Sequence, residues 1–176
     1  MIQALVSLVS KGHRNAQGLA VTTSNKLFSV EHGPQGGDEI NLIQDGGNYG
    51  WPHATYGTRY GTYDYTWPSY AIDDLELVEP FYSFVPSVAT SAIQQINGFN
   101  DRWNGDLLVG SLKAQSIYRI KFNNQRVVFN EPIYIGHRIR DIALLDHKIA
   151  LLTDDSFLIF IEVDQRSLQR NTKDRS

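Results

Sequence analysis

The sequence predicts an all-β fold, a β-propeller of which this chain supplies about three four-stranded blades. Short runs rich in β-branched and aromatic residues are separated by turn residues, and the period of 3.6 that marks helices is almost absent. The runs recur in units of about 40–45 residues, which is typical of propeller blades. With 176 residues, of which 41% are hydrophobic and 20% charged, the chain can bury one core and is predicted to be globular.

The predicted strands fall into three sets, and a further strand is expected before them at residues 4–9. The blades lie near residues 12–45, 81–135 and 138–163. Their strands are, in order, 18–21, 27–30 and 39–43; 92–96, 106–109 and 116–120; and 141–145, 148–152 and 157–161. The runs at 81–84 and 127–135 can serve as more polar outer strands of the first and second blades.

Two segments lie outside this repeat. Residues 45–86 form an insertion rich in Trp, Tyr and Phe, which could pack as a small satellite core or line a pocket for a sugar or a flat cofactor. Residues 164–176 form a polar C-terminal tail without periodicity. Because propellers typically close with about four to eight blades, three blades leave the ring open. We therefore expect either a missing N-terminal half or self-association of this chain.

Composition excludes several classes of partner. The net charge is −3 and no long run carries one sign, which argues against a nucleic-acid or an anionic membrane surface. The absence of Cys excludes disulfides and thiolate chemistry. No stretch approaches the roughly 20 apolar residues of a membrane span. The first residues lack a basic start and a cleavage site, so no signal peptide is predicted in this chain.

The segment at residues 31–52, EHGPQGGDEINLIQDGGNYGWP, combines glycine clusters with the acidic pair Asp38 and Glu39. Glycines allow backbone carbonyls to turn inward, and carbonyls with carboxylates are the ligands that Ca²⁺ prefers. The alternative is two ordinary turns between strands.

Four cations fall close to predicted strand ends: Arg14, Lys113, Arg138 and Arg140. In a propeller these ends converge at one mouth of the central channel, where such a cluster would suit an anion with several carboxylates. The alternative is scattered surface charge.

Nine short motifs occur in a fixed order along the chain. They are residues 14–18 (RNAQG), 31–34 (EHGP), 38–43 (DEINLI), 48–52 (NYGWP), 86–89 (PSVA), 110–113 (GSLK), 118–120 (YRI), 138–141 (RIRD) and 152–155 (LTDD). On these motifs the chain resembles, over residues 12–163, the C-terminal half of the soluble quinoprotein glucose/sorbosone dehydrogenases, also called aldose sugar dehydrogenases. The resemblance implies a six-bladed propeller that carries pyrroloquinoline quinone (PQQ) and Ca²⁺ on its top face.

Carried over by position, the resemblance implies roles for individual residues. Those implied to hold PQQ are Arg14, Asn15, Gln17, Tyr82, Lys113, Arg138 and Arg140. The carbonyls of Gly33 and Pro34 would bind the Ca²⁺ that polarises the quinone, and Glu39 with the Tyr49 carbonyl would bind a second, structural Ca²⁺. In the family, C1 of an aldose is oxidised by hydride transfer to the quinone, and the electrons then pass to an acceptor.

The resemblance also implies what this chain lacks. The family's catalytic His lies upstream of the RNAQG motif, and none of the five His residues here matches it. We therefore expect cofactor binding without sugar turnover by this chain alone. A non-catalytic propeller module that binds a ligand or a protein remains the alternative. The resemblance further implies a periplasmic or secreted location.

Overall fold

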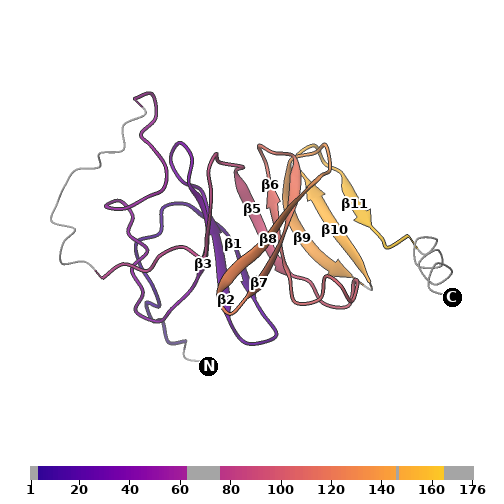
Figure 1. Cartoon of the computed structure of the whole chain (residues 1–176), viewed down its shortest axis with the longest axis horizontal. Coiled ribbons are helices and arrows are strands. Elements are labelled where there is room, and N and C mark those ends of the chain that lie inside the picture. The colour runs from indigo at the N-terminus through magenta and orange to yellow at the C-terminus, as the bar shows by residue number, and fades with distance from the viewer. Residues whose placement is uncertain (1–3, 63–75, 146, 165–176) are drawn as a thin grey trace.

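The computed structural model describes residues 4–62, 76–145 and 147–164. Within these residues, eleven strands form three antiparallel sheets that stand side by side in chain order (Figure 1), and no helix occurs. The first sheet contains β1 (Ala16–Val21), β2 (Leu27–Glu31), β3 (Asp38–Leu42) and β4 (Tyr82–Phe84). The second contains β5 (Thr90–Gln95), β6 (Leu107–Ser111), β7 (Ser116–Asn123) and β8 (Arg126–Tyr134). The third contains β9 (Ile139–Leu145), β10 (Lys148–Thr153) and β11 (Leu158–Ile161).

The predicted all-β fold is confirmed, and each predicted strand from residue 16 onward corresponds to an observed one. Strand ends differ by a few residues, which is the usual uncertainty of such boundaries. Within each sheet, neighbours in sequence are neighbours in space, so every sheet is a meander. This is the arrangement of propeller blades.

The first strand of each sheet lies against the first strand of the next, so β5 lies between β1 and β9. A glycine permits the closest of these approaches, because a Cβ added to Gly18 would lie 3.1 Å from the Ala92 Cα. At the other contact, the Ser91 hydroxyl donates a hydrogen bond of 2.5 Å to the Ile139 carbonyl. β1, β5 and β9 are therefore the inner strands, and β4 and β8 are outer strands.

Two apolar clusters fill the spaces between the sheets. Phe28, Val30 and Ile40 pack from the first sheet against the second, and Ile139 and Ile149 pack from the third sheet against the opposite face of the second. β6 in the middle is buried throughout, because Leu107 and Val109 join the first cluster while Leu108 joins the other. This alternation follows from the two-residue period of a strand.

The strand predicted at residues 4–9 is wrong. These residues form no strand, and Leu5 and Val6 are 95% and 98% exposed. An apolar run forms a strand only where another strand pairs with it, and none of the described strands does so here, although the Val9 carbonyl accepts a hydrogen bond of 2.8 Å from the Gly46 N–H. Lys11, just after it, makes an isolated parallel bridge with Asn48.

Several predicted features lie outside the described residues, namely Tyr63, Tyr65, Trp67 and Tyr70 of the aromatic insertion and residues 165–176 of the tail. None of the described residues forms a helix long and apolar enough to cross a membrane.

Candidate functional site

The strand pairings bring three pairs of strand ends to one end of the sheets. Ala16 at the start of β1 pairs with Glu31, Thr90 with Ser111, and Ile139 with Thr153. The His32 ring nitrogen Nε2 lies 2.6 Å from the Thr90 carbonyl and connects the first two pairs, and the bond from Ser91 to Ile139 connects the second and third. We call this end of the molecule the strand-start face.

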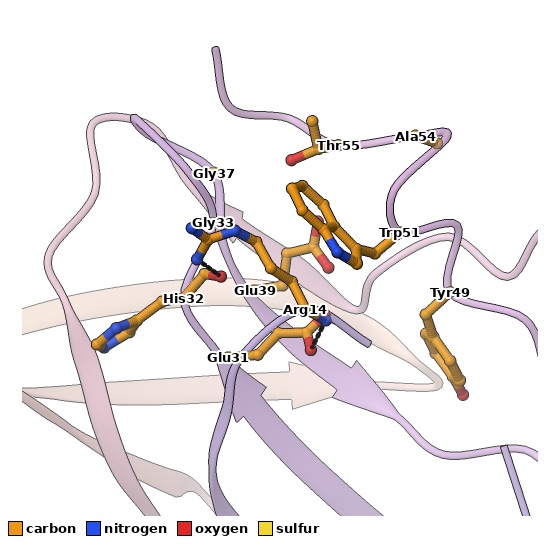
Figure 2. A pocket seen from close by; sticks show the side chains of 10 residues that line it. All are labelled: Arg14, Glu31, His32, Gly33, Gly37, Glu39, Tyr49, Trp51, Ala54 and Thr55. Atoms are coloured by element: carbon orange, nitrogen blue, oxygen red, sulfur yellow. Dashed lines mark hydrogen bonds between the residues drawn. The ribbon is translucent and has the colours of Figure 1, made fainter. Parts of the chain in front are cut away.

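Arg14 on this face is held in place before any ligand binds. Its backbone N–H donates to the Glu31 carboxylate at 3.1 Å, and its Nη1 donates to the His32 carbonyl at 3.0 Å. The guanidinium carbon lies 5.1 Å from the centre of the Trp51 ring, a cation–π contact. Figure 2 shows this side chain between the Trp51 ring and the Glu31 carboxylate.

Asn15 and Gln17 follow Arg14 and are exposed, with Gln17 Nε2 donating to Asn15 Oδ1 at 2.7 Å. Lys113, in the turn between β6 and β7, is exposed on the same face.

Arg138 and Arg140 both form ion pairs with Asp154, which the sequence did not reveal. Their Nε atoms lie 2.7 Å and 2.5 Å from the two carboxylate oxygens of Asp154. Hydrogen bonds from Arg140 and then Arg138 lower the pKa of Asp154. The predicted group of four cations therefore carries a carboxylate of its own, so less positive charge accumulates here than the sequence suggested.

Tyr82 does not join the residues of the strand-start face. It lies on β4, an outer strand, where its ring packs edge-on against Phe84 with centroids 5.0 Å apart. Its hydroxyl accepts a hydrogen bond of 2.9 Å from Asn130 on β8. The role implied for Tyr82 near the cofactor is therefore not supported by its position, which is that of a packing residue between two outer strands.

The loop between β2 and β3 carries Gly33 and Pro34 and is unusually tight. A Cβ at Gly33 would lie 2.1 Å from the Gly36 carbonyl oxygen, so only glycine fits there. The buried carboxylate of Asp38 fixes this loop by accepting from the Gly33 N–H, and it also accepts from Ser87 Oγ and from the N–H groups of Val88 and Ala89. Asp38 thus joins the first sheet to the segment that enters β5.

Two glutamates are buried side by side behind this loop. Glu31 and Glu39 face each other in the register of β2 and β3 and are only 3% and 8% exposed. Burial, followed by the neighbouring Glu31, raises the pKa of Glu39 from 4.5 to about 8. The Asn41 amide nitrogen lies 3.2 Å from Glu31 Oε1 and 3.4 Å from Glu39 Oε2. Like charges opposite one another destabilise a sheet, so this pair requires a compensating proton or cation.

Tyr49 lines the same pocket as Glu31 and Glu39. Its ring stacks on His13 with centroids 4.6 Å apart, and its hydroxyl donates to the Leu42 carbonyl at 2.6 Å. Burial raises its pKa. His13 Nδ1 lies 3.5 Å from Glu31 Oε2. The backbone of Tyr49 is thereby fixed beside the glutamates.

A small pocket is lined by these groups and by Trp51 (Figure 2). Its lining residues are Arg14, Glu31, His32, Gly33, Gly37, Glu39, Tyr49, Trp51, Ala54 and Thr55. It leaves about 10 Å³ for the centre of a water-sized sphere, which is room for one ion or one water molecule. Its buried carboxylates and backbone carbonyls are the donor types that suit Ca²⁺. Among the described residues, however, no group of three or more His, Cys, Asp or Glu side chains is arranged to hold a metal.

Sequence reasoning missed Glu31 and Asn41 as members of this site, and the stacking of Trp51 on Arg14. Alternation along β3 places Asn41 on the same face as Glu39, and the hairpin register places Glu31 opposite Glu39. Both Glu31 and Asn41 could therefore have been identified from the sequence by aligning the two strands of the hairpin. The contact of Trp51 depends on a loop and had no such signal.

Comparison with known proteins decides the family. The model of the Glucose / Sorbosone dehydrogenase family matches residues 3–159. The chain belongs to this family. It is 34% identical to the aldose sugar dehydrogenase YliI of Escherichia coli K12 over 175 residues, which are 93% of this chain and 45% of YliI.

Solved structures of this dehydrogenase family share the fold. The soluble aldose sugar dehydrogenase of Escherichia coli in its apo form matches with a TM-score of 0.76 and 33% identity, over 87% of this chain and 46% of that one. The PQQ-bound aldose sugar dehydrogenase of Streptomyces coelicolor matches with a TM-score of 0.68 and 25% identity, over 89% and 46%. The chain spans less than half the length of the curated relatives that it matches.

Proposed function

We propose that this chain forms the cofactor-binding half of a PQQ- and Ca²⁺-dependent dehydrogenase that oxidises the C1 hydroxyl of aldoses. The observation that carries the proposal is the convergence of the starts of β1, β5 and β9 on one face, with Arg14, Arg138 and Arg140 beside them. The PQQ-bound relative of the same fold supports the choice of cofactor. The donor, an aldose, and an electron acceptor are the expected partners, in a periplasmic or secreted setting.

The arginines are prepared for a polyanionic ligand. Arg14 is fixed by the His32 carbonyl and the Trp51 ring, so little side-chain entropy is lost when it binds a carboxylate. Asp154 holds Arg138 and Arg140 side by side through their Nε atoms, while about 47% and 46% of the two side chains stays exposed. Each of these two guanidinium groups therefore has further N–H donors for a second carboxylate.

The buried acids suit the cation of this chemistry. Gly33 and Pro34 would offer carbonyls, and Glu39 with the Tyr49 carbonyl would hold a second Ca²⁺, whose charge would compensate the two buried glutamates. When bound, PQQ supplies the hydride acceptor and Ca²⁺ the Lewis acid that polarises it. The residues of this chain would then bind PQQ and Ca²⁺ and orient them relative to each other.

No His of this chain matches the position of the family's proton acceptor, so we propose that the chain binds the cofactor without oxidising sugar by itself. The second candidate is a non-catalytic propeller module. It is favoured by the Asp154 pairing, which gives Arg138 and Arg140 a structural partner that needs no cofactor.

Calorimetric titration with PQQ separates the two candidates. In the presence of CaCl₂ we expect saturable binding, and Arg140→Ala should weaken it by about ten-fold or more, because a charge-assisted hydrogen bond contributes roughly 1.5–3 kcal/mol. Arg126→Ala is the matched control, since Arg126 is exposed at the start of the outer strand β8. Absence of PQQ binding, or equal losses in both variants, would favour the non-catalytic module.

A further inference from the structure

Glu31 stands outside the ligand set considered so far, although it is as deeply buried as Glu39. The residue is 3% exposed and lies opposite Glu39 in the hairpin. Both carboxylates face the same small pocket, as Figure 2 shows. No Lys or Arg side chain of the described residues forms an ion pair with either carboxylate, and the His13 ring nitrogen Nδ1 lies 3.5 Å from Glu31 Oε2.

Asn41 supplies an independent observation. It is completely buried, and its carboxamide reaches the gap between the two carboxylates, because Nδ2 lies within 3.4 Å of both. Its Oδ1 has no hydrogen-bond partner among the described residues. A buried carbonyl oxygen without a donor is costly, and it is rare in native proteins.

One rearrangement would bring a third oxygen to the two carboxylates. Turning the Asn41 carboxamide by about 180° exchanges Nδ2 and Oδ1, so that the unpartnered oxygen points into the gap between the glutamates. A divalent cation in that gap would be bound by two carboxylates and an amide oxygen. The remaining positions of a six- to eight-oxygen shell could be filled by a backbone carbonyl and by water.

We propose that Glu31 and Asn41 are direct ligands of the cation expected at Glu39, which makes this a site with two carboxylates. The inference rests on the calcium part of the proposed function. It assigns a ligand role to two residues that lie within the EHGP and DEINLI motifs but were given no role there. A shell of many flexible oxygens with two negative charges selects Ca²⁺ over Mg²⁺, because Mg²⁺ demands near-ideal octahedral geometry.

The site also bears on Arg14. Glu31 Oε2 accepts the Arg14 backbone N–H, while Oε1 faces Asn41. A cation bound by Glu31 would therefore be connected, through the Glu31 carboxylate, to the backbone N–H of Arg14.

Calcium titration of the PQQ-free protein tests the inference, with thermal melting and calorimetry as the measurements. We expect Glu39→Gln and Glu31→Gln each to weaken Ca²⁺ binding by about ten-fold or more. Asn41→Asp adds a third carboxylate, so it should lower the melting temperature without Ca²⁺ and raise the affinity for Ca²⁺. A purely structural Asn41 would lose stability without any gain in affinity. Glu162→Gln, at an exposed carboxylate paired with Lys148, is the control and should bind like the wild type.

The outcomes separate the two levels of the proposal. Wild-type affinity in Glu31→Gln, together with lost affinity in Glu39→Gln, would overturn the inference and leave the calcium part of the proposed function standing. A wild-type protein that does not respond to Ca²⁺ would contradict both. If Glu31→Gln does not fold, the sign of the Asn41→Asp effect decides alone, and an unchanged or weaker affinity would overturn the inference.

Discussion

Glu39 is the residue whose chemistry the fold changes most. It sits in a strand, 8% exposed, with another carboxylate opposite it, and burial followed by that carboxylate raises its pKa from 4.5 to about 8. Without a cation, the folded protein therefore keeps a proton on Glu39 at neutral pH. With a divalent cation in place, the ionised form becomes the stable one, as metal binding releases protons.

This shift predicts an unusual pH dependence of stability. Between about pH 4.5 and 8 the folded protein holds a proton that the unfolded chain has already released. The folded state thus binds more protons, and the free energy of unfolding falls as pH rises through this window. We expect the metal-free protein to have a lower melting temperature at pH 8 than at pH 6, and Glu39→Gln to reduce that difference.

Added CaCl₂ should raise the melting temperature more at pH 8 than at pH 6, because the ion competes with the proton on Glu39. Melting curves at the two pH values, with and without chelator, measure both effects. Equal melting temperatures for metal-free wild type at pH 6 and pH 8 would argue against a protonated Glu39.

At the scale of elements, the site depends on how loops are joined to strands. The β2–β3 loop is shaped by Gly33 and held by Asp38, whose carboxylate also binds the segment entering β5. The sequence predicted strands at 27–30 and 39–43, within a few residues of β2 and β3, and its glycines were compatible with a turn between them. It could not show that Asp38 binds backbone N–H groups some 50 residues away, since that contact depends on how two sheets pack.

Asp38→Ala should therefore disturb two loops at once. It removes the acceptor of three backbone N–H groups and of the Ser87 hydroxyl, and hydrogen bonds to a charged group contribute roughly 1.5–3 kcal/mol each. Because these losses are not additive, we expect the free energy of unfolding to fall by about 3 kcal/mol in a urea titration.

Asp45→Ala provides the comparison for this experiment. Asp45 is an exposed acid in the turn after β3, where substitutions usually change stability by no more than about 0.5 kcal/mol. Similar losses in the two variants would mean that the Asp38 bonds do not stabilise the loops.

At the scale of the whole molecule, the three sheets stand side by side. Among the sheets of the described residues, only the middle one is covered by another sheet on both faces, and the first and third carry exposed apolar residues. On the third sheet, Leu152 pairs with Leu158 beside Phe160, and these side chains are 49%, 61% and 46% exposed; on β1, Leu19 and Val21 are 67% and 64% exposed. Exposed apolar patches of this kind mark interfaces.

We predict that the isolated chain associates through these faces. A dimer would bury the third sheet of one copy against the first sheet of the other, which is a way for two half-rings to close. Light scattering at roughly tens of micromolar protein should give a mass above that of one chain. Leu158→Lys should lower that mass, and Val128→Lys, at an exposed position on β8, should not. A stable monomer would contradict the prediction.

The family and the all-β fold could be predicted from the sequence because they depend on local patterns: strand periodicity, turn residues and short motifs in a fixed order. The site was predicted less completely. Arg14, Arg138 and Arg140 remain predicted cofactor ligands, but the Asp154 carboxylate that binds the last two was not foreseen, and Tyr82, predicted near the cofactor, packs between outer strands. Side-chain partners across a strand pair or between sheets depend on register and packing, which single positions do not encode.

A crystal structure of the chain grown with PQQ and CaCl₂ tests the proposed cofactor face most directly. We predict that PQQ lies on the strand-start face, with its carboxylates within hydrogen-bond distance of the guanidinium groups of Arg14, Arg138 or Arg140. We also predict a Ca²⁺ ion between Glu31 and Glu39. Electron density for PQQ at any other surface, or a strand-start face without PQQ at saturating concentration, would contradict the assignment of this half-propeller to cofactor binding.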